Sequence, residues 1–223
     1  MIDLHSLPQI VTAIGGLGTA AFGLVDAFKV LGPLSPNRIG FGRIKKTITT
    51  LTPGGETNAL PQEKILATLQ ANWFNGTDLR DQKAIAKSLI KLNLHADNAD
   101  ALAAATGVDA ATLKVVATSI EKGTALTTSQ TDVYARFDLI ITALLDEAYQ
   151  QSDNTYRNWT RAIAAGVAVV LAVVAGLTIN PPDWQHFLQA VLVGLLATPL
   201  APIAKDLSTA LATAVNTMQS VRK

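Results

Sequence analysis

The residue types that most often perform chemistry are sparse in this chain. It has no cysteine, which excludes disulfides, thiol nucleophiles and thiolate metal sites. Its histidines, His5, His95 and His186, are isolated in sequence, and no H-E-x-x-H, G-x-S-x-G or Walker motif is present. Residues 97–100 (DNAD) have calcium-binding types but lack the spacing and terminal Glu of an EF-hand. We therefore expect no catalytic residue, no metal site and no cofactor, and predict that the protein is not an enzyme.

A glycine-rich stretch near the N-terminus has the order of a nucleotide-binding motif. Residues 16–21 read GLGTAA, which matches the G-x-G-x-x-A order of a dinucleotide fingerprint. That fingerprint needs a strand–helix–strand unit with an acidic residue about 20 positions further on. The chain instead continues with GPLSPNRIGFGR, which contains no second strand. We interpret the stretch as part of an apolar helix.

Residues 102–116 (LAAATGVDAATLKVV) resemble the helix-turn-helix of repressor-type DNA-binding proteins, with a turn at Gly107. In such proteins the second helix meets phosphates and base edges. Here that helix begins with Asp109 and offers only Lys114 as a cation, whereas counterion release needs several. We predict a structural helical corner at this position and no nucleic-acid partner.

Three uncharged blocks dominate the elements of this chain. The first, from Ser6 to Val25, has no preceding positive region, so it predicts a membrane helix and not a signal peptide. The other two, 162–179 and 187–204, are each 18 residues long and flank a Pro-Pro turn. At about 1.5 Å per residue, each nearly crosses a hydrocarbon core of about 30 Å. The pattern predicts three transmembrane helices, the last two forming a hairpin.

Between Glu56 and Asp153, in the stretch that separates the first two blocks, apolar residues recur at helical spacing among thirteen acidic and eight basic residues. We therefore predict an all-α integral membrane protein with three transmembrane helices and a cytoplasmic helical domain. The predicted parts are an N-terminal transmembrane helix (1–31), a basic Pro/Gly linker (32–56), the helical domain (57–153), the transmembrane hairpin (154–204) and a C-terminal amphipathic helix (205–223).

Small residues recur along one face of each predicted span, which lets helices approach closely in lipid. The predicted helix-packing residues are Gly16, Gly23, Ala165, Ala168, Ala172, Gly194 and Ala197. The same face of the first span carries Thr12, Thr19 and Asp26, which would face the water of a pore if the protein forms one. We expect Asp26 to pair with Lys29.

Basic residues flank the spans on one side only, and we assign them to the membrane interface: Arg38, Arg43, Lys45, Lys46, Arg157 and Arg161. The N-terminal lead and the 181–186 turn contain no Lys or Arg. The positive-inside rule then predicts that the N-terminus is outside and that the central domain and C-terminus are cytoplasmic. The basic cluster at 38–46 has a second interpretation, a docking site for anionic headgroups or for RNA.

No motif identifies an activity. We predict a membrane-anchored structural or assembly (scaffold) subunit, surrounded by a lipid bilayer and acting as a homo-oligomer or in a larger membrane complex. The alternative is an oligomeric pore or holin-like channel. A pore needs a polar face along a span, and only the first span has one.

Overall fold

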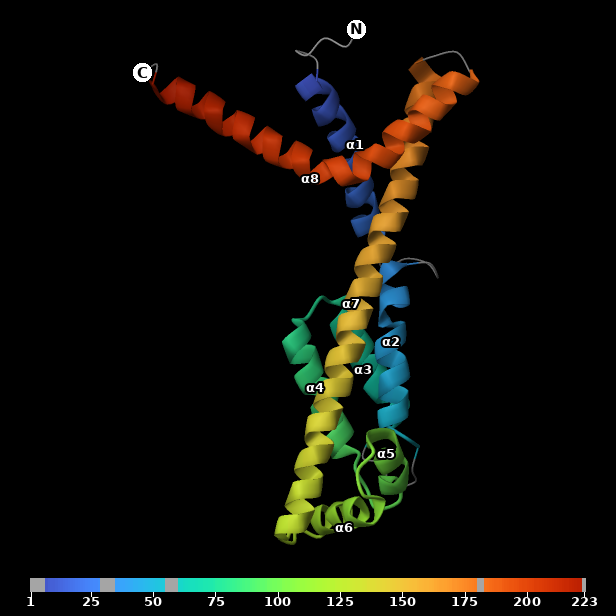
Figure 1. Ribbon diagram of the computed structural model, residues 1–223, viewed down its shortest axis with the longest axis vertical. Coiled ribbons are helices and arrows are strands. Elements are labelled where there is room, and N and C mark those ends of the chain that lie inside the picture. Colours follow the sequence, from blue (N-terminus) through green and yellow to red (C-terminus); the bar gives the residue numbers. More distant parts are fainter. Residues whose placement is uncertain (1–6, 29–34, 55–59, 180–182, 222–223) are drawn as a thin grey trace. The chain divides into compact units, whose positions relative to one another are not determined.

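The computed structural model describes residues 7–28, 35–54, 60–179 and 183–221, with side chains for 10–28, 35–54, 60–179 and 183–203 (Figure 1). Throughout these ranges the regular structure is helical and no strand occurs. The helices are α1 (Leu7–Ala27), α2 (Pro36–Leu51), α3 (Gln62–Phe74), α4 (Leu79–Leu92), α5 (Ala99–Thr106), α6 (Ala110–Glu121), α7 (Thr128–Ile179) and α8 (Trp184–Val221).

The chain divides into two compact units. Residues 1–31 and 157–223 form one, which we call the apolar unit, and residues 32–156 form the other, which we call the globular unit. Helix α7 contributes its first part to the globular unit and its second part to the apolar unit. Each unit has its own buried cluster of apolar side chains.

Helix α2 corrects the predicted linker at 32–56. Pro36 stands at the start of the helix, where its missing N–H is not needed, and Ser35 caps it by accepting from the backbone N of Arg38 at 3.3 Å. A Cβ on Gly40 would lie 3.0 Å from both Trp73 and Tyr156, so this glycine marks a close helix contact and not a loop. Two of the residues that indicated a linker, Pro36 and Gly40, therefore have roles in starting and packing a helix.

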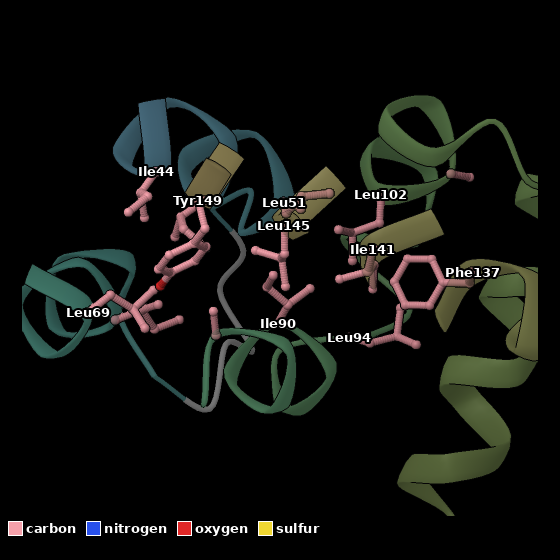
Figure 2. Close-up of a cluster of buried hydrophobic side chains, with 14 of the residues drawn as sticks. Ile44, Leu51, Leu69, Ile90, Leu94, Leu102, Phe137, Ile141, Leu145 and Tyr149 are labelled. Carbon is pink, nitrogen blue, oxygen red and sulfur yellow. The ribbon is translucent and has the colours of Figure 1, made fainter. Parts of the chain in front are cut away.

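The core of the globular unit forms around α7 (Figure 2). Phe137, Ile141, Leu145 and Tyr149 recur every four residues and are all buried, so they lie along one face of the helix. Apolar residues of the other helices meet this face: Ile44, Ile48, Leu51, Ile65, Leu69, Ala86, Ile90, Leu102 and Leu113. Each fully buried large side chain contributes about 1.5–3 kcal/mol relative to exposure.

Ion pairs between α4 and α7 close one side of this core. Lys87 and Lys91 both reach Asp138, at 2.5 and 2.9 Å, and Lys83 reaches Asp146 at 2.5 Å. Partial burial lowers the pKa of Lys91, but the hydrogen bond to Asp138 and the nearby Tyr134 ring outweigh this effect and hold it above its usual value. Two of the acidic residues of this unit, Asp138 and Asp146, thus pair with a row of lysines on α4.

The apolar unit consists of α1, the second part of α7, and α8. Helix α8 is continuous from Trp184 to Val221, so the predicted amphipathic segment 205–223 is the end of this helix and not a separate element. Its backbone changes direction part-way along in Figure 1, and Pro199 and Pro202 lie inside it. Each proline removes one backbone hydrogen bond, which accounts for a bend. Side chains beyond 203 lie outside the described part.

Candidate membrane-spanning unit

Three helices of the described chain are long and apolar enough to cross a membrane. The segments are Ile10–Ala27 in α1, an 18-residue apolar stretch in α7, and Trp184–Ile203 in α8. They correspond to the three uncharged blocks of the sequence. This finding rests on length and composition.

Burial in this unit is the reverse of burial in the globular unit. The buried residues at its centre are small, with Ala164, Ala168 and Ala197 fully enclosed. Large apolar side chains point outward, for example Val170 at 61% and Leu192 at 58% exposure. The other exposed large apolar residues of α7 and α8 in this unit are Trp159, Val174, Leu177, Ile179, Trp184, Phe187, Leu188, Leu195, Leu196 and Ile203. An apolar outer surface with a small-residue interior is the pattern expected of helices packed in lipid.

Two glycines lie at close contacts between helices of this unit. A Cβ on Gly18 of α1 would lie 2.0 Å from the carbonyl oxygen of Ala197 in α8. A Cβ on Gly194 of α8 would lie 2.4 Å from Cα of Val169 in α7. Both distances are to backbone atoms, which cannot rotate away as a side chain can. These two positions therefore allow backbones to approach where any larger residue would hold them apart.

The predicted helix-packing residues divide between this contact and the outer surface. Ala168, Ala172, Gly194 and Ala197 are buried in the unit, whereas Ala165 is half-buried and the neighbouring Ala164 is fully buried. On α7 the contact face therefore contains Ala168 and Ala172 of the predicted set and has Ala164 in place of Ala165.

On α1 the contact within the chain uses a face other than the predicted one, so packing through Gly16 and Gly23 stays a prediction for contacts between chains. Gly16 and Gly23 are exposed, and a Cβ on either would meet nothing within 4 Å. The buried face instead contains Gly18, Ala21 and Val25. The sequence GGLG offers small residues on more than one face, so spacing alone does not select the face that meets α8. Gly18 is the packing residue that the sequence analysis missed, and its only signal was membership of this glycine-rich stretch.

The residues predicted to face a pore lie toward the outside of the single chain. Thr12 is half-buried, and Thr19 and Asp26 are exposed. The Thr19 hydroxyl donates to the carbonyl oxygen of Gly15 at 3.0 Å, which satisfies it within its own helix. Lys29, the predicted partner of Asp26, lies outside the described residues.

The predicted interface cations are all exposed. Arg38, Arg43, Lys45 and Lys46 lie on α2 of the globular unit, whereas Arg157 and Arg161 lie on α7 in the apolar unit. Aromatic rings mark both ends of the apolar stretch of α7 and α8: Trp159 is 43% exposed, and Trp184 stacks on Phe187 with ring centroids 5.5 Å apart. Such rings are enriched at membrane–water interfaces.

Two of the three histidines, His95 and His186, lie within the described residues. His95 Nδ1 lies 3.1 Å from Glu121 Oε1 and joins the α4–α5 loop to the end of α6. His186 is half-buried in the first turn of α8, and His5 lies outside the described residues. Within the described residues, no group of three or more His, Asp or Glu side chains is arranged to hold a metal ion.

The segment resembling a helix-turn-helix forms a corner between α5 and α6. Gly107 ends α5 with a φ of 69°, and Asp109 caps α6 by accepting from the backbone N of Thr112 at 2.8 Å. Lys114, the one cation of the second helix, lies 3.4 Å from Asp100. The corner packs into the core through Leu102 and Leu113.

No protein-family model, curated protein sequence or solved structure matches this chain.

Proposed function

We propose that this protein is a membrane-anchored assembly subunit, with the apolar unit inserted in a bilayer and the globular unit held at its surface to meet partner molecules. The observation that carries the proposal is the reversed burial of the apolar unit. Large apolar residues such as Val170 and Leu192 are exposed, and alanines are enclosed. In water, each large side chain left exposed forgoes about 1.5–3 kcal/mol of burial. Lipid removes this cost.

The globular unit has the opposite character. It carries thirteen acidic and eight basic residues between Glu56 and Asp153 and has its own apolar core. A charged side chain at the centre of a bilayer costs several kcal/mol, so this unit belongs in water. The proposed arrangement keeps the N-terminus outside, with the globular unit and the C-terminus in the cytoplasm, because the basic residues lie on that side of each span.

Two features favour an anchor over a pore. The outer surface of the apolar stretches of α7 and α8 is formed by large apolar residues, which suit contact with lipid or with another helix. The Thr19 hydroxyl of α1 is bonded to its own helix, so it does not require water. Assembly through homo-oligomerisation or within a larger complex is part of the proposal.

Membrane insertion is tested by flotation of the expressed full-length chain with vesicles after alkaline carbonate extraction. We expect the protein to stay with the vesicles. After extraction in mild detergent, it should sediment in analytical ultracentrifugation with a protein mass larger than that of one chain. Release into the carbonate supernatant would contradict the anchor. If the protein is monomeric in several mild detergents and no other protein co-purifies with it, the assembly role is contradicted.

An oligomeric pore is the second candidate function. It is favoured by the exposure of Thr19 and Asp26 on the side of α1 that faces away from the buried cluster. Purified protein reconstituted in planar bilayers would then conduct ions, and Asp26→Asn would change the selectivity, because a ring of carboxylates selects cations. The anchor proposal predicts no conductance from either protein.

A further inference from the structure

The outer face of α2 is strongly and uniformly basic. Its sequence, PNRIGFGRIKKTITTL, contains four cations and no acidic residue. Phe41, Ile44, Ile48 and Leu51 occupy the buried face. At about 100° per residue, the four cations fall on the opposite side of the helix, together with Gly42, Thr49 and Thr50. All of these outer residues are exposed.

These cations differ from the other row of cations in the same unit. Lys83, Lys87 and Lys91 of α4 all pair with carboxylates of α7. In the described part of the chain, no ion pair involves any of the four cations of α2. Within the described residues, the cations of α4 are thus paired with carboxylates of the same unit, whereas those of α2 are not.

The first turns of α2 lie beside the residues of α7 at which the globular unit ends. A Cβ on Gly40 would lie 3.0 Å from Cβ of Tyr156, and the backbone N of Ile44 donates to Ser152 Oγ at 3.3 Å. Trp73 closes this end by donating from Nε1 to the carbonyl oxygen of Asn37 at 3.0 Å. The start of α2 and the last residues of α7 that belong to the globular unit therefore lie side by side within that unit.

We propose that the outer face of α2 binds the anionic headgroups of the membrane in which the apolar unit is inserted. This inference rests on the proposed function, because it requires a bilayer at the end of the globular unit where the chain leaves it. The four cations span about 12 Å along the helix, from Arg38 to Lys46. This length is close to the Debye length of about 8–10 Å, the distance over which salt screens exposed charges, so neighbouring cations can act on the same anionic surface together. In addition, one guanidinium group can donate two parallel hydrogen bonds to the oxygens of a phosphate.

The absence of cysteine makes a direct measurement simple. The full-length chain carrying Gly42→Cys receives a spin label on the outer face of α2, where an added Cβ would meet nothing within 4 Å. It is placed in nanodiscs of phosphatidylcholine alone or with anionic phosphatidylglycerol, each containing a nickel-chelating lipid. Power saturation reports collision of the label with headgroup nickel. Ser88→Cys, on the exposed side of α4, is the control position.

We expect headgroup collision at position 42 to rise in anionic nanodiscs and to fall in high salt, with no change at position 88. The triple variant Arg43→Gln, Lys45→Gln and Lys46→Gln should abolish the rise. Each cation near an anionic surface is worth about fivefold in binding, from about 1 kcal/mol. The matched variant Lys64→Gln, Lys114→Gln and Lys122→Gln removes the same charge elsewhere and should retain the rise.

Equal collision in neutral and anionic nanodiscs would overturn the inference and leave the cations as a topological signal only. A label at position 42 that responds to added RNA or to an acidic peptide, and not to anionic lipid, would also overturn it and identify a different partner. Both outcomes are distinct from failure of the proposed function, in which the chain would not float with vesicles at all.

Discussion

A Gly18→Ala substitution tests the packing of the apolar unit most sharply. The added Cβ would lie 2.0 Å from the Ala197 carbonyl oxygen and 2.6 Å from its carbonyl carbon. The first distance is about 1.5 Å short of the roughly 3.5 Å at which such atoms are in contact. Because the obstacle is backbone, α1 and α8 must separate, and a gap of even 0.5–1 Å forfeits about a quarter to a half of the dispersion energy of each contact.

The expected cost is about 1–3 kcal/mol, as for other overpacked interiors. Gly16→Ala is the matched control, since a Cβ there meets nothing within 4 Å. Both glycines lie inside α1, so the gain in helix propensity, up to about 1 kcal/mol, is the same for each and cancels in the comparison. The difference between the two variants therefore isolates the helix contact.

The assay is reversible unfolding of the full-length protein in mixed micelles of mild detergent and dodecyl sulfate, followed by circular dichroism. We expect Gly18→Ala to unfold at a lower mole fraction of dodecyl sulfate than Gly16→Ala. The free energies of unfolding of the two variants should differ by about 1–3 kcal/mol. Equal free energies within about 0.5 kcal/mol would refute the packing account, because substitutions without such contacts fall in that range. Greater damage from Gly16→Ala would instead support the face predicted from spacing, acting between chains.

Further predictions concern both units. Gly194→Ala should destabilise the apolar unit by a similar amount, about 1–3 kcal/mol in the same assay, because its Cβ would lie 2.4 Å from Val169 Cα. Asp138→Asn, which weakens the pairs to Lys87 and Lys91, should lower the thermal stability of the globular unit by about 1 kcal/mol, and the loss should shrink in 1 M salt; Asp146→Asn, at a more exposed pair, is the control and should cost less. Trp73→Phe should cost about 1 kcal/mol in urea unfolding, because it removes the hydrogen bond from the indole N–H to the carbonyl of the buried Asn37, and an unchanged midpoint would contradict that bond. The pKa of Asp109 is held below its usual value by hydrogen bonds from Thr112, so its stabilisation should be present above the unfolded pKa and be lost as the pH falls through the folded one; a pH titration of the unfolding midpoint that is identical in Asp109→Asn would contradict this.

The elements that follow from hydrophobic periodicity were predictable from the sequence. Residues such as Phe137, Ile141 and Leu145 recur at the spacing of one helix face, and the three uncharged blocks coincide with the three helices long enough to span a membrane. Absence of charge over 18 residues is a signal that needs no knowledge of tertiary contacts.

Features that depend on tertiary contact were not predictable in this way. Pro36 and Gly40 are residue types that are common in loops. In the structure Pro36 starts α2, and Gly40 allows α2 to contact Trp73 of α3 and Tyr156 of α7. Similarly, Gly16 and Gly18 are equal as small residues, and only the position of Ala197 selects between them. At such positions, tertiary contacts override the intrinsic conformational propensity of the residue.

Cysteine labelling tests the central claim, that the chain crosses a membrane three times with the globular unit inside, most directly. Single cysteines at Ser6, Ser88, Gln185 and Ser220 can be introduced without a background, because the chain has none. An impermeant maleimide on intact cells should label positions 6 and 185, and should label 88 and 220 only after the membrane is permeabilised. Labelling of position 88 on intact cells, or equal labelling of positions 88 and 185 under both conditions, would contradict the account.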